Sequence, residues 1–143
     1  MEAATTKIKK SVLIKQRKDE AKALKGGAST ARLQNCPTSP RKMRLVVDLI
    51  RGENVEKALY ILKFTNKEAA IRVEKLLLSA IKNWEARNDD KRVEESNLYV
   101  KEVLVGGGPQ MKRLRPAPQG RGYRIRKRSN HVTLVVDSKN ENN

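Results

Sequence analysis

Acidic residues are missing from one long stretch of this 143-residue chain. Between Gly106 and His131, eight Lys or Arg side chains occur without a single Asp or Glu. The only large aliphatic residues of the stretch are Met111, Leu114 and Ile125, too few for it to fold as part of a core. Charge of this density without neutralisation calls for a polyanionic partner, and a nucleic-acid phosphate backbone is the commonest one.

The chain is also poor in the residues that build catalytic and metal sites. Cys36 is the only cysteine, which excludes an intramolecular disulfide, and we expect a small buried apolar side chain there. His131 is the only histidine, so a cluster of histidine metal ligands cannot form, nor can a Ser–His relay with a spare partner. We therefore expect no enzyme activity, no cofactor and no metal.

Long apolar runs and aromatic residues are scarce as well. No run approaches the roughly 20 apolar residues of a membrane span, and the N-terminus lacks the apolar stretch of a secretory signal. One Trp, one Phe and three Tyr imply a modest, aliphatic core. We expect one folded domain without membrane contact.

The charge that is present lies mainly outside the part that looks globular. The chain has 32 basic and 16 acidic residues, a net charge of +16. Residues 1–25 carry +5, residues 26–105 carry only +4, residues 106–131 carry +8 and the last twelve residues carry −1. This distribution predicts a compact body with two basic extensions.

The order of segments divides the chain into three parts. We expect a basic N-terminal extension over residues 1–30, whose last five residues, Gly-Gly-Ala-Ser-Thr, form a flexible joint. A single domain should follow over residues 31–137, beginning with a short extended segment, residues 31–36. Residues 138–143 are expected to be a polar tail.

Helical spacing of apolar residues predicts two short helices early in the body. The first, residues 40–51, has Ser39 as its cap, Pro in its first position and Gly52 as its stop. The second, residues 55–63, has Asn54 as its cap. Each has one apolar face, which predicts packing against a core.

A third and longer helix is predicted after Thr65. Thr65 and Glu68 match the capping-box pattern T-x-x-E, and residues 88–90, Asn-Asp-Asp, should close the helix. Its apolar stripe keeps helical spacing for about five turns, which predicts core packing. The stripe consists of Ala69, Val73, Leu76, Leu77, Ala80, Ile81 and Trp84.

Two Val- and Leu-rich runs, residues 98–105 and 132–136, flank the basic stretch and predict β-strands. Leu98 lies 18 residues before Pro116, and Val136 lies 18 residues after Pro118. Equal arms predict an antiparallel hairpin turning at residues 116–118. Its arms would measure roughly 50–60 Å, so the outer half must project from so small a body. The glycines at 106–108 predict a bend or bulge.

These elements predict an α+β fold: a small three-helix and antiparallel-sheet body with a long protruding β-hairpin and a basic N-terminal extension. Three other readings stay open. The two short helices could form a helix-turn-helix that binds duplex DNA, although the second offers only Lys57 and Lys63 beside Glu56. Residues 8–13 could lie on an acidic membrane. An enzyme would need a pocket of perturbed ionisable groups, for which the sequence has no candidates.

Three blocks of the chain resemble one known family, that of large-subunit ribosomal protein L twenty-two. The first is SPRKMRLVVDLIRG at residues 39–52, and the second is ALYIL at residues 58–62 with the long helix after it. The third comprises Gly-Pro at 108–109, Met-Lys-Arg at 111–113, Gly-Arg at 120–121 and KRSNHVT at 127–133. The resemblance covers about residues 31–136. Residues 118, 122 and 123 depart from the residues expected near the hairpin tip.

The resemblance implies a body on the outer surface of the large ribosomal subunit and a hairpin that threads inward through ribosomal RNA. It implies a cytoplasmic protein, within the ribosome, that supports subunit assembly and contacts neighbouring ribosomal proteins and the passing nascent peptide; no homo-oligomer is expected. The residues expected to bind RNA are Arg41, Lys42, Arg44, Lys112, Arg113, Arg115, Arg121, Arg124, Arg126, Lys127, Arg128 and His131. Those expected to line the nascent-peptide exit tunnel are Met111, Lys112, Arg113, Leu114, Arg115, Pro116, Ala117, Pro118, Gln119, Gly120 and Arg121.

Overall fold

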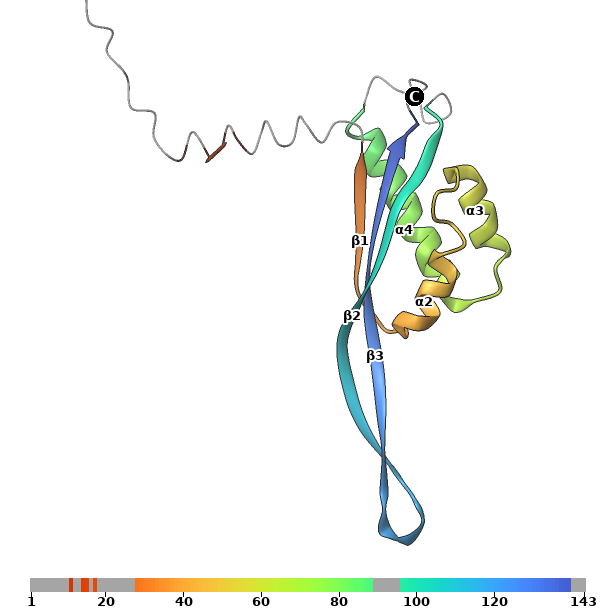
Figure 1. The fold of residues 1–143 in the computed structure, drawn as a ribbon, viewed down its shortest axis with the longest axis vertical. Coiled ribbons are helices and arrows are strands. Elements are labelled where there is room, and N and C mark those ends of the chain that lie inside the picture. Colours follow the sequence, from red (N-terminus) through yellow and green to blue (C-terminus); the bar gives the residue numbers. More distant parts are fainter. Residues whose placement is uncertain (1–10, 12–13, 16, 18–27, 89–95, 140–143) are drawn as a thin grey trace, which may run out of the picture.

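Three strands and three helices form the described part of the chain. The computed structural model describes residues 11, 14–15, 17, 28–88 and 96–139 (Figure 1). The α+β class predicted from the sequence is confirmed. The elements are β1 (Ser29–Cys36), α2 (Pro40–Val47), α3 (Val55–Phe64), α4 (Glu68–Glu85), β2 (Leu98–Pro116), a 3₁₀ turn (Pro118–Gly120) and β3 (Gly122–Ser138).

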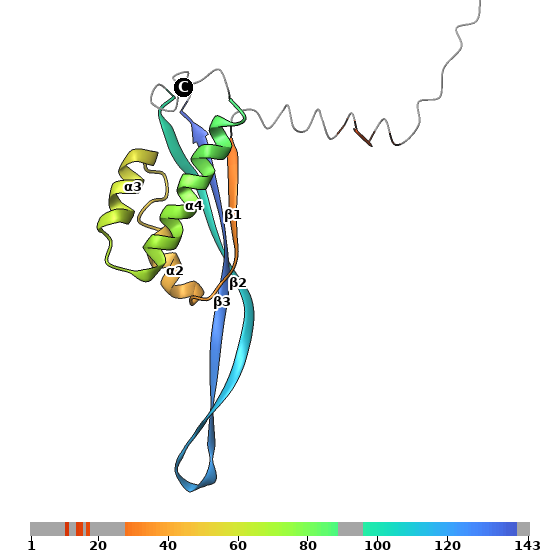
Figure 2. The same ribbon diagram turned by 180° about the vertical axis from the view of Figure 1, so that it is seen from behind.

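The three strands form one antiparallel sheet in the order β1-β3-β2. β1 pairs with the central strand only from Ser29 opposite Val136 to Cys36 opposite Asn130. Beyond that point β2 and β3 continue alone, so residues 108–129 form a two-stranded ribbon that leaves the body, here called the arm (Figures 1 and 2). At about 3.3 Å per residue, its eight-residue outer strands extend the molecule by roughly 25 Å.

The body is held together by helix α4, which lies along one face of the sheet (Figures 1 and 2). Its apolar stripe faces Val132, Leu134 and Val136 of β3, which are all fully buried because alternate residues of a strand point to one face. Cys36 is buried in this core, as predicted. Ile81, counted in the stripe, is only partly buried.

Polar contacts fasten the start of β1 to the end of α4. The buried Ser29 hydroxyl donates to the carbonyl of Ala80 (2.7 Å), and Asn83 Nδ2 donates to the carbonyl of Thr30 (3.1 Å). Ser29 and Thr30 thus belong to the sheet, so the strand begins two residues earlier than predicted. The rest of the predicted extension, apart from residues 11, 14–15, 17 and 28, lies outside the described residues.

The free edge of β2 is covered by the segment that follows α2. The amide of Gly52 donates to the carbonyl of Val100, and the amide of Val100 donates to the carbonyl of Glu53, both at 2.9 Å. Arg51 Nη2 donates to the carbonyl of Val103 at 3.2 Å. The unpaired backbone groups of an edge strand can bond to another chain. Here these contacts occupy backbone groups of β2, so fewer are left for such pairing.

The end of helix α2 differs from the prediction. Helix α2 ends at Val47 instead of residue 51, and the chain then turns through Leu49 and Ile50, whose amides bond three residues back. Gly52 completes this turn with a φ of +78°, a left-handed conformation that glycine adopts without strain.

The capping box predicted for α4 is wrong. Lys67 is the residue before the helix, and no side chain caps its first turn. The Thr65 hydroxyl instead donates to the carbonyl of Ile61 at the end of α3 (2.6 Å), while Glu68 pairs with Arg72. In so short a connection Thr65 is closer to the helix that ends than to the one that begins.

The hairpin register also differs from the prediction, and β2 contains two irregularities. Pairing shifts by one residue between Val100 and Glu102 and again between Gly107 and Gln110, where the glycines predicted a bulge. At the base of the hairpin, Leu98 pairs with Ser138 instead of Val136. The turn centres on Gln119, which has a φ of +62°, two residues later than equal arms would place it.

Candidate nucleic-acid interface

The positively charged side chains of the arm are exposed to solvent. Its Lys and Arg side chains are all exposed, and so is almost every other residue from Pro109 to Arg128. Each ion pair found among the described residues lies in the body, between Arg51 and Asp48, Lys57 and Glu53, Arg72 and Glu68, and Lys101 and Asp137. The body thus neutralises much of its own charge, whereas the arm offers its charge to a partner.

The predicted binding residues of α2 lie near the base of the arm. Arg41 and Lys42 are exposed. Arg44 is exposed as well, but its Nη2 atom donates to the carbonyl of Val105 (3.2 Å), which links α2 to β2 just before the arm begins. Arg44 therefore has a structural contact in addition to its charge.

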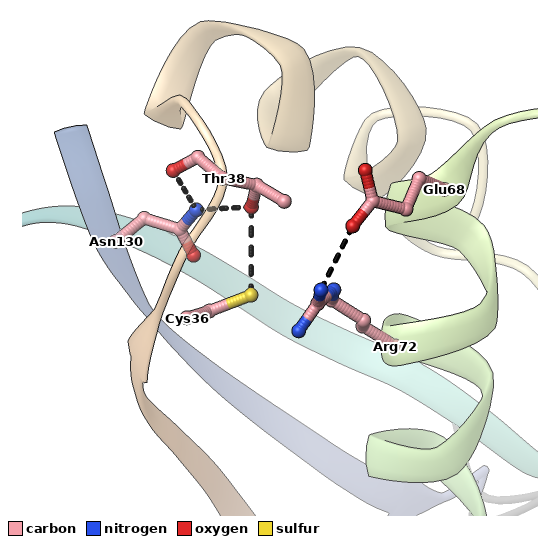
Figure 3. A network of polar contacts seen from close by, with 5 residues as sticks. All are labelled: Cys36, Thr38, Glu68, Arg72 and Asn130. Atoms are coloured by element: carbon pink, nitrogen blue, oxygen red, sulfur yellow. Dashed lines mark hydrogen bonds and ion pairs between the residues drawn. The ribbon is translucent and has the colours of Figure 1, made fainter. Parts of the chain in front are cut away.

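Asn130 joins the base of the arm to the loop after β1 (Figure 3). Its side chain is fully buried, and Nδ2 donates to the carbonyl and the hydroxyl of Thr38, both at 2.7 Å. The same hydroxyl lies 3.4 Å from the thiol of Cys36. Buried hydrogen bonds of this kind are costly to break, so they fix the direction in which β3 leaves the sheet.

His131 and Ser129 make further contacts at this base. His131 is half-buried, and its Nδ1 atom accepts a hydrogen bond from the amide of Asn35 (3.1 Å). The Ser129 hydroxyl donates to the carbonyl of Pro109 across the bulge (2.6 Å). His131 thus has a structural partner in the body, although it was predicted as an RNA contact.

Gly108 is the residue that lets the two strands approach at the bulge. A Cβ atom at this position would lie 2.6 Å from Oγ of Ser129 and 3.2 Å from Nε2 of His131. Neighbouring Gly107 has nothing within 4 Å of its corresponding position. Only one of the two glycines is therefore required by close packing.

Arg72 and Glu68 form an ion pair near the Asn130 network (Figure 3). The hydrogen bond to Glu68 (2.8 Å) is the main cause that raises the pKa of the Arg72 guanidinium, and the nearby Cys36 thiol adds to it. Arginine is protonated at any physiological pH, so this pair is a structural contact with no acid–base role.

A shallow groove of about 610 Å³ runs along the outer part of the arm. It is lined by three consecutive cross-strand pairs: Lys112 with Arg126, Arg113 with Ile125, and Leu114 with Arg124. Four of the six lining residues are Lys or Arg, so this groove is strongly basic.

Sequence reasoning missed the residues that connect the arm to the body. Asn35, Thr38 and Asn130 are small polar residues; Asn35 bonds His131, 96 positions later in the chain, and Thr38 bonds Asn130, 92 positions later. No local pattern marks them, since their partners become neighbours only when β1 pairs with β3.

The helix-turn-helix reading finds no support in the second helix. On α3, Lys57 is paired with Glu53 at 2.9 Å, and the exposed residues include Glu56, Tyr60 and Phe64. In the part of the chain that the structure describes, no helix could cross a membrane and no three His, Cys, Asp or Glu residues gather in a metal site.

Comparisons with known proteins agree on one family. The family model described as ribosomal protein L22p/L17e matches residues 31–137. The chain is 62% identical over 126 residues to a protein of Christiangramia forsetii named large ribosomal subunit protein uL22, covering 88% of this chain and 93% of the relative. Proteins of the same name from Bacteroides fragilis (58% over 134 residues, 94% and 95%) and Porphyromonas gingivalis (63% over 113 residues, 79% and 84%) are also similar.

Proposed function

The chain belongs to the ribosomal protein L22p/L17e family, and from this premise we propose that it binds ribosomal RNA as a structural constituent of the large ribosomal subunit. Its role in translation is structural, not enzymatic, and it acts in the cytoplasm as part of the ribosome. The observation that carries the proposal is the arm, which combines eight exposed cations, no acid and a shape too thin to form a core.

The division into body and arm gives each part a task. The body supplies a folded anchor with nearly balanced charge, and the arm inserts between RNA helices whose phosphates would otherwise repel one another. Arg side chains suit this task because their planar forks bind phosphate through two donors. RNA is then recognised through shape and backbone, without a base code. This neutralisation is how the protein supports subunit assembly.

The turn of the arm is the part that reaches deepest. We place the tip, residues 111–121, in the wall of the nascent-peptide exit tunnel, where it meets the passing peptide. Arg41, Lys42 and Arg44 bind RNA beside the base of the arm, together with His131. Neighbouring large-subunit proteins contact the body, and the chain does not pair with itself.

The basic N-terminal extension adds affinity without choosing the site. Residues 1–25 carry a net charge of +5 but lie outside the segment that matches the family. Deleting them should lower the salt dependence of RNA binding by at most about 0.7–0.9 log units per lost phosphate contact. The RNA footprint of body and arm should stay the same, and a shifted footprint would contradict this assignment.

A charge-matched pair of variants tests the proposal. In the arm variant, Lys112, Arg113, Arg115 and Arg121 become Ala; in the body variant, the exposed Lys57, Lys63, Lys67 and Lys75 become Ala. Both lose four charges and neither alters the apolar core. The arm variant should incorporate poorly into large subunits while its thermal unfolding stays nearly unchanged, and the body variant should incorporate well. Equal incorporation of the two would refute a special role for the arm.

The alternative of a duplex-DNA regulator is tested by competition. The full chain should prefer folded large-subunit RNA to a palindromic DNA duplex at the same salt concentration. A preference for the duplex would overturn the ribosomal assignment.

A further inference from the structure

The two faces of the arm have different compositions. Between Gln110 and Arg128 the register is continuous, and residues directly opposite one another point to the same face. One face, here called the charged face, comprises Gln110, Lys112, Leu114, Arg124, Arg126 and Arg128. The other, here called the mixed face, comprises Met111, Arg113, Arg115, Tyr123, Ile125 and Lys127.

The bulge at residues 108–109 produces this division. Without the extra residue of β2, Arg113 would lie opposite Arg124 instead of Ile125, and the arginines of both strands would share one face. With it, each cross-strand pair of the mixed face joins one cation to one apolar side chain: Met111 with Lys127, Arg113 with Ile125, and Arg115 with Tyr123.

The charged face holds like charges directly opposite each other. Lys112 lies opposite Arg126, and neither has an acidic neighbour on the arm. Such a pair repels itself until an anion lies between the two side chains. This face therefore suits the phosphates of an RNA backbone, with no need for contact to bases.

The mixed face is laid out in two columns over its outer part. Arg113 and Arg115 follow one another along β2, while Ile125 and Tyr123 follow one another beside them along β3. Tyr123 is 66% exposed and Ile125 is 38% exposed, so both apolar surfaces are free on a ribbon that has no core of its own. The groove on the arm is lined by four residues of the charged face, Lys112, Leu114, Arg124 and Arg126, and only its two remaining lining residues belong to the mixed face.

We propose that the mixed face binds an unpaired segment of RNA, with its phosphates along Arg113 and Arg115 and its bases against Ile125 and Tyr123. A single strand carries phosphates on one side and flat bases on the other, and proteins bind it by combining a basic track with side chains on which bases stack. A duplex hides its bases and fits only the charged face. The inference rests on the proposed function and assigns a separate RNA class to each face.

The full chain offers a matched set of variants. In the first, Tyr123→Ala and Ile125→Ala remove the apolar column of the mixed face. The control, Leu114→Ala, removes an apolar side chain of the same arm that is 75% exposed but lies on the charged face. A third variant, Lys112→Ala with Arg126→Ala, removes the repelling pair of the charged face.

Binding is measured against two probes, a short oligouridylate and an RNA duplex of the same length. The mixed-face variant should bind the oligouridylate at least about fivefold more weakly, since losing one stacking side chain has about this effect, and should bind the duplex normally. The Leu114 control should bind both probes normally. The charged-face variant should lower the salt slope for the duplex by about 1–2 log units.

The outcomes separate this inference from the proposed function. If the unmodified chain binds both probes but the mixed-face variant and the Leu114 control weaken them equally, the assignment of faces is wrong and the ribosomal role stands. If the mixed-face variant loses duplex binding as strongly as single-strand binding, the assignment is also wrong. If the unmodified chain binds neither probe, both the proposed function and this inference fail.

Discussion

Gly108 and Gly107 are adjacent glycines for which the structure predicts different outcomes on substitution. A Cβ atom at Gly108 would lie 2.6 Å from Oγ of Ser129, closer than side chains tolerate, whereas a Cβ atom at Gly107 meets nothing within 4 Å. Neither glycine has the positive φ that would make any other residue strained. The comparison of Gly108→Ala with Gly107→Ala therefore isolates the close approach of the strands.

The expected difference follows from the contacts that must move. Ser129 has to rotate, which breaks its 2.6 Å bond to the carbonyl of Pro109. A shift of His131 weakens its bond to the amide of Asn35. At roughly 0.5–1.5 kcal/mol for each bond, Gly108→Ala costs about 1–3 kcal/mol. Both variants also restrict the unfolded chain, which stabilises by about 0.4–1 kcal/mol and cancels in the comparison.

Urea unfolding followed through the fluorescence of the buried Trp84 measures this difference. Gly107→Ala should be slightly more stable than the unmodified chain, and Gly108→Ala should fall about 1–3 kcal/mol below Gly107→Ala. In a Ser129→Ala background the cost of Gly108→Ala should shrink, because the clashing oxygen is gone. Equal stability of the two glycine variants would refute the account of the bulge.

Three further predictions concern the body and the free arm. Leu77→Ala should destabilise by about 2–5 kcal/mol in urea unfolding because Leu77 is fully buried, while Leu78→Ala, at 43% exposure, should lose far less; similar losses would place the core wrongly. In hydrogen exchange of the free protein, amides of α4 should be protected and those of residues 109–124 should exchange fast, because an isolated two-stranded ribbon is marginal in water; uniform protection would contradict a separate arm. Lys101 Nζ donates a hydrogen bond to the carboxylate of Asp137 at 2.7 Å, which raises the pKa of Lys101. The stabilisation from the raised lysine pKa is lost as pH rises through the raised value, so the stability difference between Lys101→Met and the unmodified chain should persist at neutral pH and disappear in strong alkali; a difference that vanished near neutral pH would contradict the assignment.

Features that depend on neighbouring residues could be predicted from the sequence. The stripe of α4 was read from its spacing alone, since residues such as Val73, Leu77 and Trp84 recur on one side of any helix they form. The burial of Cys36 was predicted from its residue type, and a bend or bulge was predicted from the run of glycines. These features depend on residues within a few positions of one another.

Features that depend on residues far apart in the chain could not be predicted from the sequence. The capping pattern at Thr65 was present in the sequence, but the hydroxyl serves the preceding helix because that carbonyl lies nearer. Equal arm lengths gave a turn two residues too early: the pairing of Leu98 with Ser138 instead of Val136 moves the turn by one residue, and the two irregularities, which add residues to β2 only, move it by one more. The contact of Asn130 with Thr38 exists only once β1 and β3 have paired.

The candidate interface likewise has one feature that the sequence predicts and one that it does not. That the arm binds a polyanion follows from composition, since eight cations without an acid need a partner whatever the register. Which cations share a face does not follow, because one bulge residue decides whether Arg113 lies opposite Ile125 or opposite Arg124. The sequence alone therefore predicts the class of partner but not the arrangement of the side chains that meet it.

Cryo-electron microscopy of large subunits assembled with this chain tests the central claim most directly. The account predicts that the body lies at the subunit surface, that the arm is enclosed by ribosomal RNA with phosphates beside Lys112 and Arg126, and that the turn around Gln119 reaches the tunnel wall. An arm that projects into solvent, or a body seated without any RNA around residues 109–128, would contradict it.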